Sequence, residues 1–598
     1  MEIKAKKRSE ISADYKWKLE DMYQTEADWR QDMDVIAAKL EEIAGYQGKL
    51  ITGEALEACL DKFFTAGQIM GKVYVYANMK MHEDANVSAS QGLADTAQNM
   101  YVKFSAATAF ITPEILSHEE NIIRGFVANT PGLKMYEHYL EDIIRGKAHV
   151  LSSEIEEILA NSGELGNAPS NIFSMLSNAD LKFGTITDEN GNTVEITRGR
   201  YGGLIESQDR RVRKDAFETY YASYEKLKNT FAAMFNASVK KDVFFARTRK
   251  YGSALDAALS ANNIPRAVYE QLIETVNEFL PVMHRYIALR KKALKLDELH
   301  QYDLYAPLAE KADTKVTYED AKKKLVESLE ILGADYLEAM AKGMESGWID
   351  VYENEGKRSG AYSWGAPGNH PYVLMNYDDK LNDMFTLAHE MGHAMHSYYS
   401  WDTQPNVYAR YTIFLAEVAS TVNETLLMDY MLETTTDPKV RTYLLSEYLD
   451  QFVGTVFRQT MFAEFELITH DMVENDKPLT LAALNKVFRE LTAKYSGPDV
   501  VLDEQIELGW ARIPHFYTAF YVYQYATGYS AAIALKKRLQ TGNPQALEDY
   551  LDFLKAGSSD YSIEILKKAG VDMSTPTPVR EALMMFEELV EKMEKVFE

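Results

Sequence analysis

The chain has 598 residues, of which 46% are hydrophobic, and its formal net charge is -26 at pH 7. The hydrophobic content is ample for large cores, and the length exceeds what one core usually supports, so we expect at least two lobes. A net charge this negative argues against nucleic acid as a partner, because phosphate binding needs a basic surface. The few basic runs, such as residues 247–250, are best explained as solvated helix faces.

The sequence also favours an intracellular protein that does not enter a membrane. No stretch approaches the roughly 20 apolar residues of a membrane span, and the first ten residues lack the apolar segment of a secretory signal. Cys59 is the only cysteine, so neither an internal disulfide nor a thiolate metal cluster can form. We therefore expect a cytoplasmic location, with no membrane and no nucleic acid among the partners.

Helical periodicity dominates the first third of the chain. Apolar residues recur at steps of three and four between residues 26 and 160. Residues 129–132 and 161–169 are rich in residue types that end helices, so we expect a break at each place. Residues 183–197 predict a β-hairpin, because two stretches of alternating polarity flank the turn sequence DENGN. The helical pattern then resumes to about residue 332.

A second β-like region precedes the most informative motif. Residues 360–365 and 372–377 have strand character and are joined by a turn-rich link. A sheet edge in the stretch Gly360 to Ser363 could bind an extended peptide through main-chain hydrogen bonds, which ignore side-chain identity. The alternative is a hairpin whose edge is already covered.

The most informative motif is HEMGH at residues 389–393. On a helix, His389 and His393 lie one above the other, where two neutral imidazoles can hold one Zn²⁺. Glu390 follows the first histidine and lies within reach of a water on the metal, as a general base. Residues 382–383 are suited to cap such a helix. The alternative is an exposed His-Glu-His triple that binds no metal.

A catalytic zinc needs three protein ligands and one position open to water. The extended pattern HExxHxxGxxH is absent, because His396 and Tyr399 occupy the positions of its glycine and third histidine. Glu417 and Glu424 lie seven residues apart in an apolar segment, so both fall near one face of a following helix. We expect Glu417 to be the third ligand, or otherwise a salt-bridged helix residue, and Glu424 to orient a ligating histidine.

The ordered set of motifs resembles the M3 family of zinc oligopeptidases, in particular the oligoendopeptidase F type. HEMGHAMHS followed by EVASTVNE carries the resemblance at the predicted metal site. Further similar segments are YKWKLEDMY at 15–23, GAYSWG at 360–365, IPHFY at 513–517, YLDFLKAG at 550–557 and KAGVD at 568–572. Together these segments span nearly the whole chain in order.

The resemblance implies a mainly α, two-lobed, zincin-type metallopeptidase with a deep channel and a small β element beside the zinc helix. It divides the chain into an N-terminal helical lobe of residues 1–200, with the hairpin, and a catalytic lobe of residues 201–598. One Zn²⁺ per chain is expected on His389, His393 and Glu417. Short peptides are the expected substrates.

A third group of residues is expected to stabilise the oxyanion of a tetrahedral intermediate, which histidine and tyrosine side chains can do. His515 matches the histidine that thimet-type members of the family use. The Gly-Gly pair that precedes their first tyrosine is absent, so Tyr521 and Tyr525 are chosen because they lie one helical turn apart. An aromatic stripe with this spacing is also typical of a helix core.

These features predict a zinc-dependent endopeptidase that hydrolyses internal bonds of short peptides. Zinc would polarise the scissile carbonyl, while Glu390 takes the water proton and delivers it to the leaving amine. One alternative is an HExxH metallocarboxypeptidase, which releases single C-terminal residues. Another is a non-catalytic helical protein that binds peptides around a structural zinc, although structural sites usually have four protein ligands. A chance motif in an unrelated helical protein is the third.

Overall fold

The computed structural model describes residues 5–309 and 315–598, which are mainly α-helical. The expected fold class is therefore confirmed. The chain forms two compact units, each assembled from three segments: Met1–Ala148, Asp313–Tyr430 and Leu535–Gly570 in the first, and His149–Ala312, Met431–Ala534 and Val571–Glu598 in the second. The expected domains, by contrast, are consecutive parts of the chain that meet at residue 200. That boundary stays a prediction.

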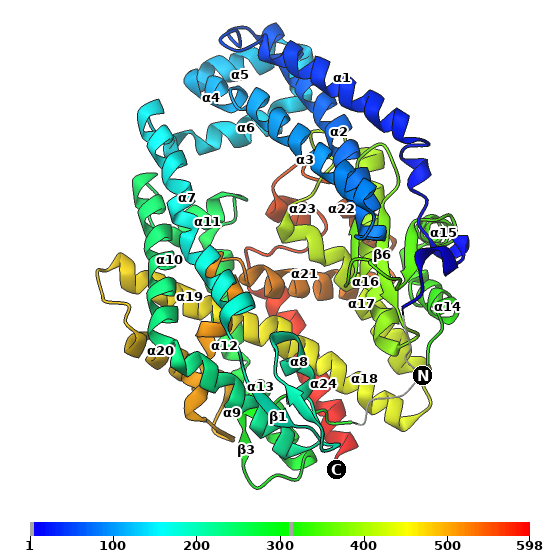
Figure 1. The fold of residues 1–598 in the computed structure, drawn as a ribbon, viewed down its shortest axis with the longest axis vertical. Helices are drawn as coiled ribbons and strands as arrows, with labels where there is room; N and C mark the ends of the chain where they lie inside the picture. The colour runs from blue at the N-terminus through cyan, green and yellow to red at the C-terminus, as the bar shows by residue number, and fades with distance from the viewer. Residues whose placement is uncertain (1–4, 310–314) are drawn as a thin grey trace. The chain divides into compact units, whose positions relative to one another are not determined.

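The first unit holds helices that begin at well-defined caps. The side chain of Thr25 accepts the N–H of Asp28, and that of Thr52 accepts the N–H of Ala55, so α1 and α2 each start with a backbone donor satisfied. Figure 1 shows α1, α2 and α3 side by side. The helices are α1 (Glu26–Ala44), α2 (Gly53–Glu83), α3 (Ser88–Thr108), α4 (Ile111–Ser117), α5 (Glu120–Asn129), α6 (Glu137–Arg145), α14 (Tyr318–Ser328), α15 (Ala334–Glu345), α16 (Leu381–Thr403), α17 (Ile413–Thr434), α22 (Pro544–Lys555) and α23 (Ser562–Lys568).

The small sheet of the first unit lies directly before α16. Strands β4 (Ile349–Tyr352), β6 (Tyr372–Tyr377) and β5 (Tyr362–Trp364) pair in the order β4-β6-β5. β5 is antiparallel to β6, with Tyr362 opposite Leu374, as expected for this region. β4 is parallel to β6 and was not predicted. β5 is therefore an edge strand of this sheet, and both β5 and β6 pack against α16.

A hydrophobic core joins the sheet to the first helices. Trp17, Trp29 and Met70 are buried together with Tyr372 and Leu374 of β6. The indole N–H of Trp29 donates to the carbonyl of Val73 at 3.0 Å, so its one polar atom is satisfied in the core. The amino-terminal segment thus packs on the sheet that supports α16.

The second unit is also helical and contains the predicted hairpin. Strands β1 (Thr185–Thr187) and β2 (Thr193–Glu195) are antiparallel, with Ile186 opposite Val194, which confirms the hairpin. A two-residue parallel pair, β3 (Leu299–His300) with β7 (Val500–Val501), was not predicted. The helices are α7 (Ser153–Met175), α8 (Arg198–Ile205), α9 (Arg210–Lys226), α10 (Lys228–Thr248), α11 (Ala254–Ser260), α12 (Arg266–Glu278), α13 (Leu280–Ala293), α18 (Pro438–Phe452), α19 (Arg458–Glu474), α20 (Leu481–Ser496), α21 (Tyr523–Gln540), which runs into the first unit, and α24 (Thr577–Val596).

One predicted helix break is confirmed and the other is wrong. Helix α5 ends at Asn129, before Pro131, as expected. Residues 161–169 instead lie inside α7, which continues through Pro169. Packing against α10 favours the helix, because Gly166 lets the two helices approach: a methyl group there would lie 3.2 Å from the ring of Phe245. Tertiary contacts outweigh the local cost of the proline.

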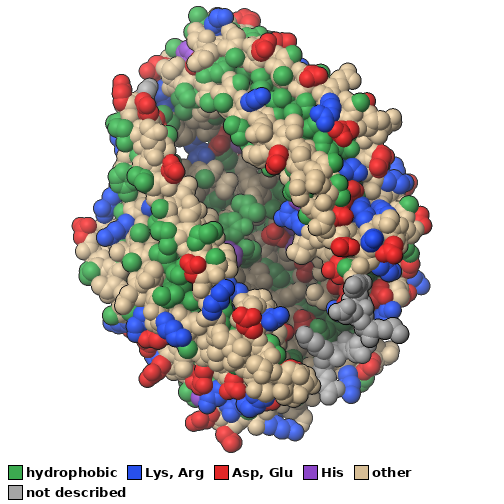
Figure 2. Space-filling view, in the orientation of Figure 1, with side chains coloured by type: hydrophobic (Ala, Val, Ile, Leu, Met, Phe, Trp, Pro, Cys, Tyr) green, Lys and Arg blue, Asp and Glu red, His purple; other side chains and the backbone are tan. Residues whose placement is uncertain are grey.

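Charged side chains of both signs lie on the surface (Figure 2). On the face shown in Figure 2, Lys and Arg side chains lie scattered among Asp and Glu side chains. Within residues 5–309 and 315–598, none of the helices combines the length and the apolar character that a membrane crossing requires.

Candidate active site

Helix α16 carries the HEMGH motif on its middle turns. Its start is fixed by Asp383, whose Oδ2 accepts the backbone N–H groups of Asp378 and Lys380 at 2.8 and 3.1 Å. The sequence had suggested residues 382–383 as the cap of this helix. Asp383 is instead the third residue of the helix. The helix places His389 and His393 on one face, with their Nε2 atoms 3.0 Å apart.

Glu417 on α17 completes a group of three possible metal ligands. Its Oε2 lies 3.4 Å from Nε2 of His389 and 3.5 Å from Nε2 of His393. In a tetrahedral site with bonds of about 2.0–2.1 Å, ligand atoms are separated by roughly 3.3–3.4 Å, so the three atoms have the spacing that zinc requires. Among the described residues, this is the group of His, Cys, Asp or Glu whose ligand atoms converge within 4.8 Å.

Glu424 fixes the orientation of His389. Its Oε1 accepts a hydrogen bond from Nδ1 of His389, which directs Nε2 at the other two ligand atoms. Burial lowers the pKa of His389, but the carboxylates of Glu424, Glu390 and Glu417 outweigh this and raise it to about 9. Burial likewise raises the pKa of Glu417, yet the two imidazoles hold it below its usual value. The group is thus an electrostatic cluster in which imidazole and carboxylate stabilise each other's charge.

Glu390 has the environment of a general base. Its side chain is only 6% exposed, and one carboxylate oxygen has no hydrogen-bond partner within the described part of the chain. Burial raises its pKa above the ordinary value, opposed by the imidazoles of His389 and His393. A buried carboxylate with a free oxygen beside converging metal ligands is suited to proton transfer.

The close approach of α16 and α17 brings these side chains together. A methyl group on Gly392 would lie 2.5 Å from Cα of Ser420 and 2.8 Å from the carbonyl oxygen of Ala419. Only a residue without a side chain fits at this contact, because backbone atoms cannot move aside. Ser420 lies between Glu417 and Glu424, so the contact sets the distance of both carboxylates from α16.

Further hydrogen bonds hold the two helices in register. The amide of Asn423 on α17 donates to the carbonyl of Ala388 on α16 at 3.3 Å, and its Oδ1 accepts the hydroxyl of Tyr336 at 3.1 Å. The Tyr411 ring stacks on His396 with centroids 3.7 Å apart. Burial lowers the pKa of His396 to about 3, so its imidazole is neutral, and it lies outside the group of converging ligand atoms.

The predicted oxyanion residues lie together in the second unit. His515 belongs to a 3-10 turn, η11 (Pro514–Tyr517), and its ring centroid lies 6.2 Å from that of Tyr521 and 6.0 Å from that of Tyr525. All three side chains are partly exposed. Burial lowers the pKa of His515, which favours a neutral imidazole with one N–H to donate. Tyr521 precedes α21, so the expectation that both tyrosines share one helix is wrong, although their rings are 5.6 Å apart.

A buried carboxyl group shapes the turn before Tyr521. Phe520 has a positive φ of 58°, which is costly for a residue with a large side chain. Its backbone N–H donates at 2.9 Å to Oε1 of Glu466, which is fully buried. This bond offsets the strain and fixes where Tyr521 leaves the turn.

Several of these supporting residues escape sequence reasoning. Gly392 lies inside the HEMGH motif. Its small size among larger neighbours is the one signal in the sequence that could have indicated its role. Asn423, Tyr336 and Glu466 act through partners far along the chain, so no spacing within the sequence announces them.

Comparisons with known proteins define the class. The profile of Peptidase family M3 matches residues 203–585, and the profile described as Oligopeptidase F matches residues 114–183. The chain is 47% identical to oligopeptidase PepF of Bacillus subtilis, over 98% of this chain and 88% of that protein. It is 41% identical to group B oligopeptidase PepB of Streptococcus agalactiae, over 98% of each chain.

Solved structures agree. A candidate peptidase from Chlamydophila abortus superimposes with a TM-score of 0.94 at 36% identity, covering 99% of this chain and 100% of the other. Oligoendopeptidase F from Enterococcus faecium gives 0.74 at 39% identity, covering 96% and 99%. The fold is therefore that of a metallopeptidase.

The chain belongs to peptidase family M3. These relatives favour a metallo-endopeptidase over a metallocarboxypeptidase or a non-catalytic peptide-binding protein.

We predict that Gly392→Ala weakens both the fold and the metal site. The added methyl group must push α17 away, which should cost about 1–3 kcal/mol of unfolding free energy and weaken zinc binding at least tenfold. Thermal unfolding and chelator competition measure the two effects. Gly92→Ala in α3 is the matched control, because no atom lies within 4 Å of the added methyl group. It should leave metal binding unchanged and add up to about 1 kcal/mol of stability. Wild-type zinc affinity in Gly392→Ala would contradict the role of this contact.

We also predict different losses from the two glutamates of α17. Glu424→Gln keeps the size of the side chain but loses the charge that orients His389, so zinc affinity should fall roughly 10–100-fold. Glu417→Ala removes a ligand atom and should cost more, with substoichiometric zinc after dialysis. Metal analysis and chelator competition rank the variants. The reverse order would exchange the roles of the two residues.

Proposed function

We propose that the chain is a zinc-dependent endopeptidase that hydrolyses internal bonds of short peptides. The observation that carries the proposal is the convergence of His389, His393 and Glu417 beside the buried carboxylate of Glu390. The names of the relatives, oligopeptidase and oligoendopeptidase, support short peptides as the substrates. The proposed division at residue 200 is compatible with the family profile, which begins at residue 203.

One Zn²⁺ per chain would be held by His389, His393 and Glu417, with the fourth position left open. When bound, the metal supplies Lewis acidity that polarises the scissile carbonyl and acidifies water. Two imidazoles and one carboxylate are a donor set that zinc uses in peptidases. Glu424 acts through His389, since its hydrogen bond keeps the Nε2 lone pair directed at the group.

Glu390 is the proposed general base. Its free, buried oxygen accepts the proton of the attacking water and later delivers it to the leaving amine. The raised pKa makes this carboxylate a stronger base for the first of these proton transfers.

His515, Tyr521 and Tyr525 are the proposed oxyanion donors. Their clustering supports this role, since a neutral imidazole N–H and phenolic hydroxyls can each donate to a developing negative charge. Strand β5 is the proposed place where an extended peptide adds to the sheet, because it is an edge strand packed against α16.

The proposed location is the cytoplasm. Cys59, the one cysteine of the chain, is buried and reduced, as expected for a protein that needs no disulfide in a reducing compartment.

We predict that Glu390→Gln keeps its zinc and loses at least a hundredfold in turnover, since general-base catalysis contributes about 10²–10⁴-fold. The assay uses peptides blocked at both ends, with products identified by mass spectrometry. Glu338→Gln, at an exposed position on α15, is the control for loss of one charge and should retain full activity. Full turnover by Glu390→Gln would remove Glu390 from the mechanism.

Release of single residues from free C-termini alone would favour a carboxypeptidase. A chelator that lowers the melting temperature without any hydrolysis to abolish would favour a non-catalytic zinc protein.

We further predict that His515→Gln, Tyr521→Phe and Tyr525→Phe lower kcat, with little change in KM or zinc content. Loss of one oxyanion donor typically costs about 10²–10³-fold, and the residue that donates directly should show the largest loss. Tyr517→Phe is a control from the same segment, because the ring of Tyr517 packs against Phe173 and Phe235. Equal, near-normal kcat in all three variants would assign these residues to packing.

A further inference from the structure

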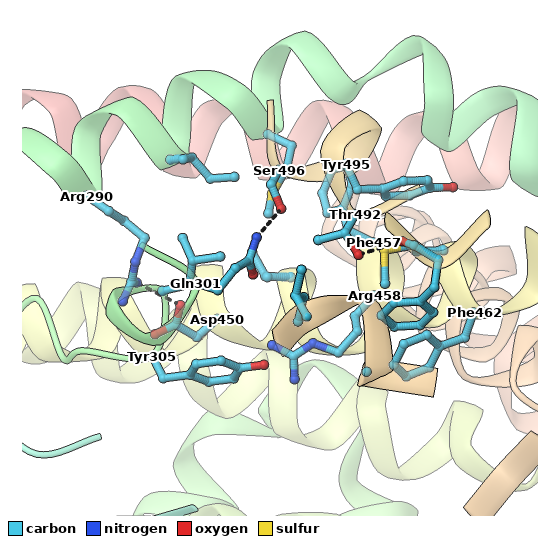
Figure 3. A pocket seen from close by; sticks show the side chains of 18 of the residues that line it. Arg290, Gln301, Tyr305, Asp450, Phe457, Arg458, Phe462, Thr492, Tyr495 and Ser496 are labelled. Atoms are coloured by element: carbon cyan, nitrogen blue, oxygen red, sulfur yellow. Dashed lines mark hydrogen bonds and ion pairs between the residues drawn. The ribbon is translucent and has the colours of Figure 1, made fainter. Parts of the chain in front are cut away.

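The second unit encloses a cavity that the peptidase chemistry does not use. Its volume is about 110 Å³, and it lies among α13, α19, α20 and the 3-10 turns η7 (Gln301–Asp303) and η10 (Glu504–Arg512). Figure 3 shows the lining side chains. None of them belongs to the unit that carries the predicted metal ligands. One water needs roughly 10–15 Å³. The cavity is therefore several times larger than a single water requires.

The wall combines apolar side chains with three arginines. Apolar lining residues include Met283, Ile287, Leu304, Phe457, Phe462 and Phe488. The cationic lining residues are Arg290, Arg458 and Arg512, and the lining contains one carboxylate, Asp450. The formal charge of this wall is therefore positive, in a protein whose net charge is -26.

Two of the three arginines have partners. Arg290 donates to Asp450 at 3.1 Å, to the hydroxyl of Tyr286 at 2.8 Å and to the carbonyl of Ala306. Its charge is thus balanced by the one carboxylate of the wall. Nε of Arg512 donates to the hydroxyl of Tyr221 at 3.2 Å.

Arg458 differs from both. Its guanidinium carbon lies 5.1 Å from the centre of the Tyr305 ring, a cation–π contact. Within the described part of the chain it has neither a hydrogen bond nor an ion pair, and Figure 3 shows no dashed line at its guanidinium. Its charge, with that of Arg512, lowers the pKa of Tyr305 despite burial, so the field in the cavity favours negative charge. A partly buried guanidinium in an apolar wall is costly without an anion.

The backbone beside Arg458 is irregular in a way that points to a binding site. Helices α18 and α19 are continuous through a π-helical turn at Val453–Phe457, directly before Arg458. A π-helical turn widens a helix and costs stability, and such turns occur frequently at functional sites. Val453 and Phe457 both line the cavity, so the turn forms part of its wall.

We propose that this cavity binds a small organic monocarboxylate with an apolar body. Of the three guanidinium groups in the wall, that of Arg458 makes neither a hydrogen bond nor an ion pair within the described residues, and its planar fork matches the two oxygens of one carboxylate. The apolar side chains of the wall provide a surface for an aliphatic or aromatic body. A bare inorganic anion has no such body, so it would leave these side chains without a contact. Tyr305 and Arg512 line the same cavity.

Calorimetry with three probes tests the proposal on the zinc-loaded enzyme. The probes are phenylacetate, its neutral analogue phenylacetamide, and inorganic phosphate. Arg458→Met keeps the apolar stem and removes the fork. Arg30→Met, at an exposed position on α1, is the control for loss of one surface charge. We expect phenylacetate to bind the wild type and the control equally, and Arg458→Met at least tenfold more weakly. Phenylacetamide should bind the wild type at least tenfold more weakly than phenylacetate.

Three results would overturn the proposal. Equal phenylacetate affinity in Arg458→Met would show that the carboxylate binds elsewhere, for example at the metal. Absence of phenylacetate binding to the wild type would exclude the ligand class. Phosphate binding as tight as phenylacetate would show that the site senses charge alone. If Arg458→Met does not fold, Arg458→Lys replaces it; it keeps the charge but loses the fork, and an unchanged affinity in that variant would equally count against the proposal.

Discussion

The contact between the backbones of α16 and α17 at Gly392 and Ser420 is the constraint on which the site depends. Two histidines on one helix provide only one edge of a metal site. The third ligand must come from a neighbour whose distance is fixed to within a few tenths of an ångström. Because Gly392 has no side chain, α17 comes close enough for Glu417 to reach both imidazoles and for Glu424 to reach His389 from behind.

The electrostatics of the cluster follow from that contact. Three carboxylates, Glu390, Glu417 and Glu424, face two imidazoles in a partly buried place, and each shifts the pKa of its neighbours. Such a concentration of negative charge costs free energy unless a cation balances it. A divalent metal provides that balance, and the unpaired oxygen of Glu390 remains available for proton transfer. Binding and catalysis thus draw on one arrangement of charge.

The sequence predicts those features of the fold and of the site that depend on local spacing. The HEMGH helix, the hairpin at 183–197, the strands before α16 and the pairing of Glu417 with the histidines all follow from periodicity, turn chemistry and motif spacing. Sequence reasoning fails where contacts with distant segments determine the local structure. Helix α7 continues through Pro169 because α10 packs against it, and Tyr521 lies before α21 because Glu466 fixes the preceding turn. Neither partner is visible from the residues beside it.

X-ray absorption at the zinc edge of the purified, metal-loaded enzyme can identify the ligands of the metal. We expect one zinc per chain, with two imidazole nitrogens and one carboxylate oxygen at about 2.0–2.1 Å and one further light-atom ligand. A third imidazole, a fourth protein ligand or a zinc site that survives substitution of both His389 and His393 would contradict the ligand set His389, His393 and Glu417.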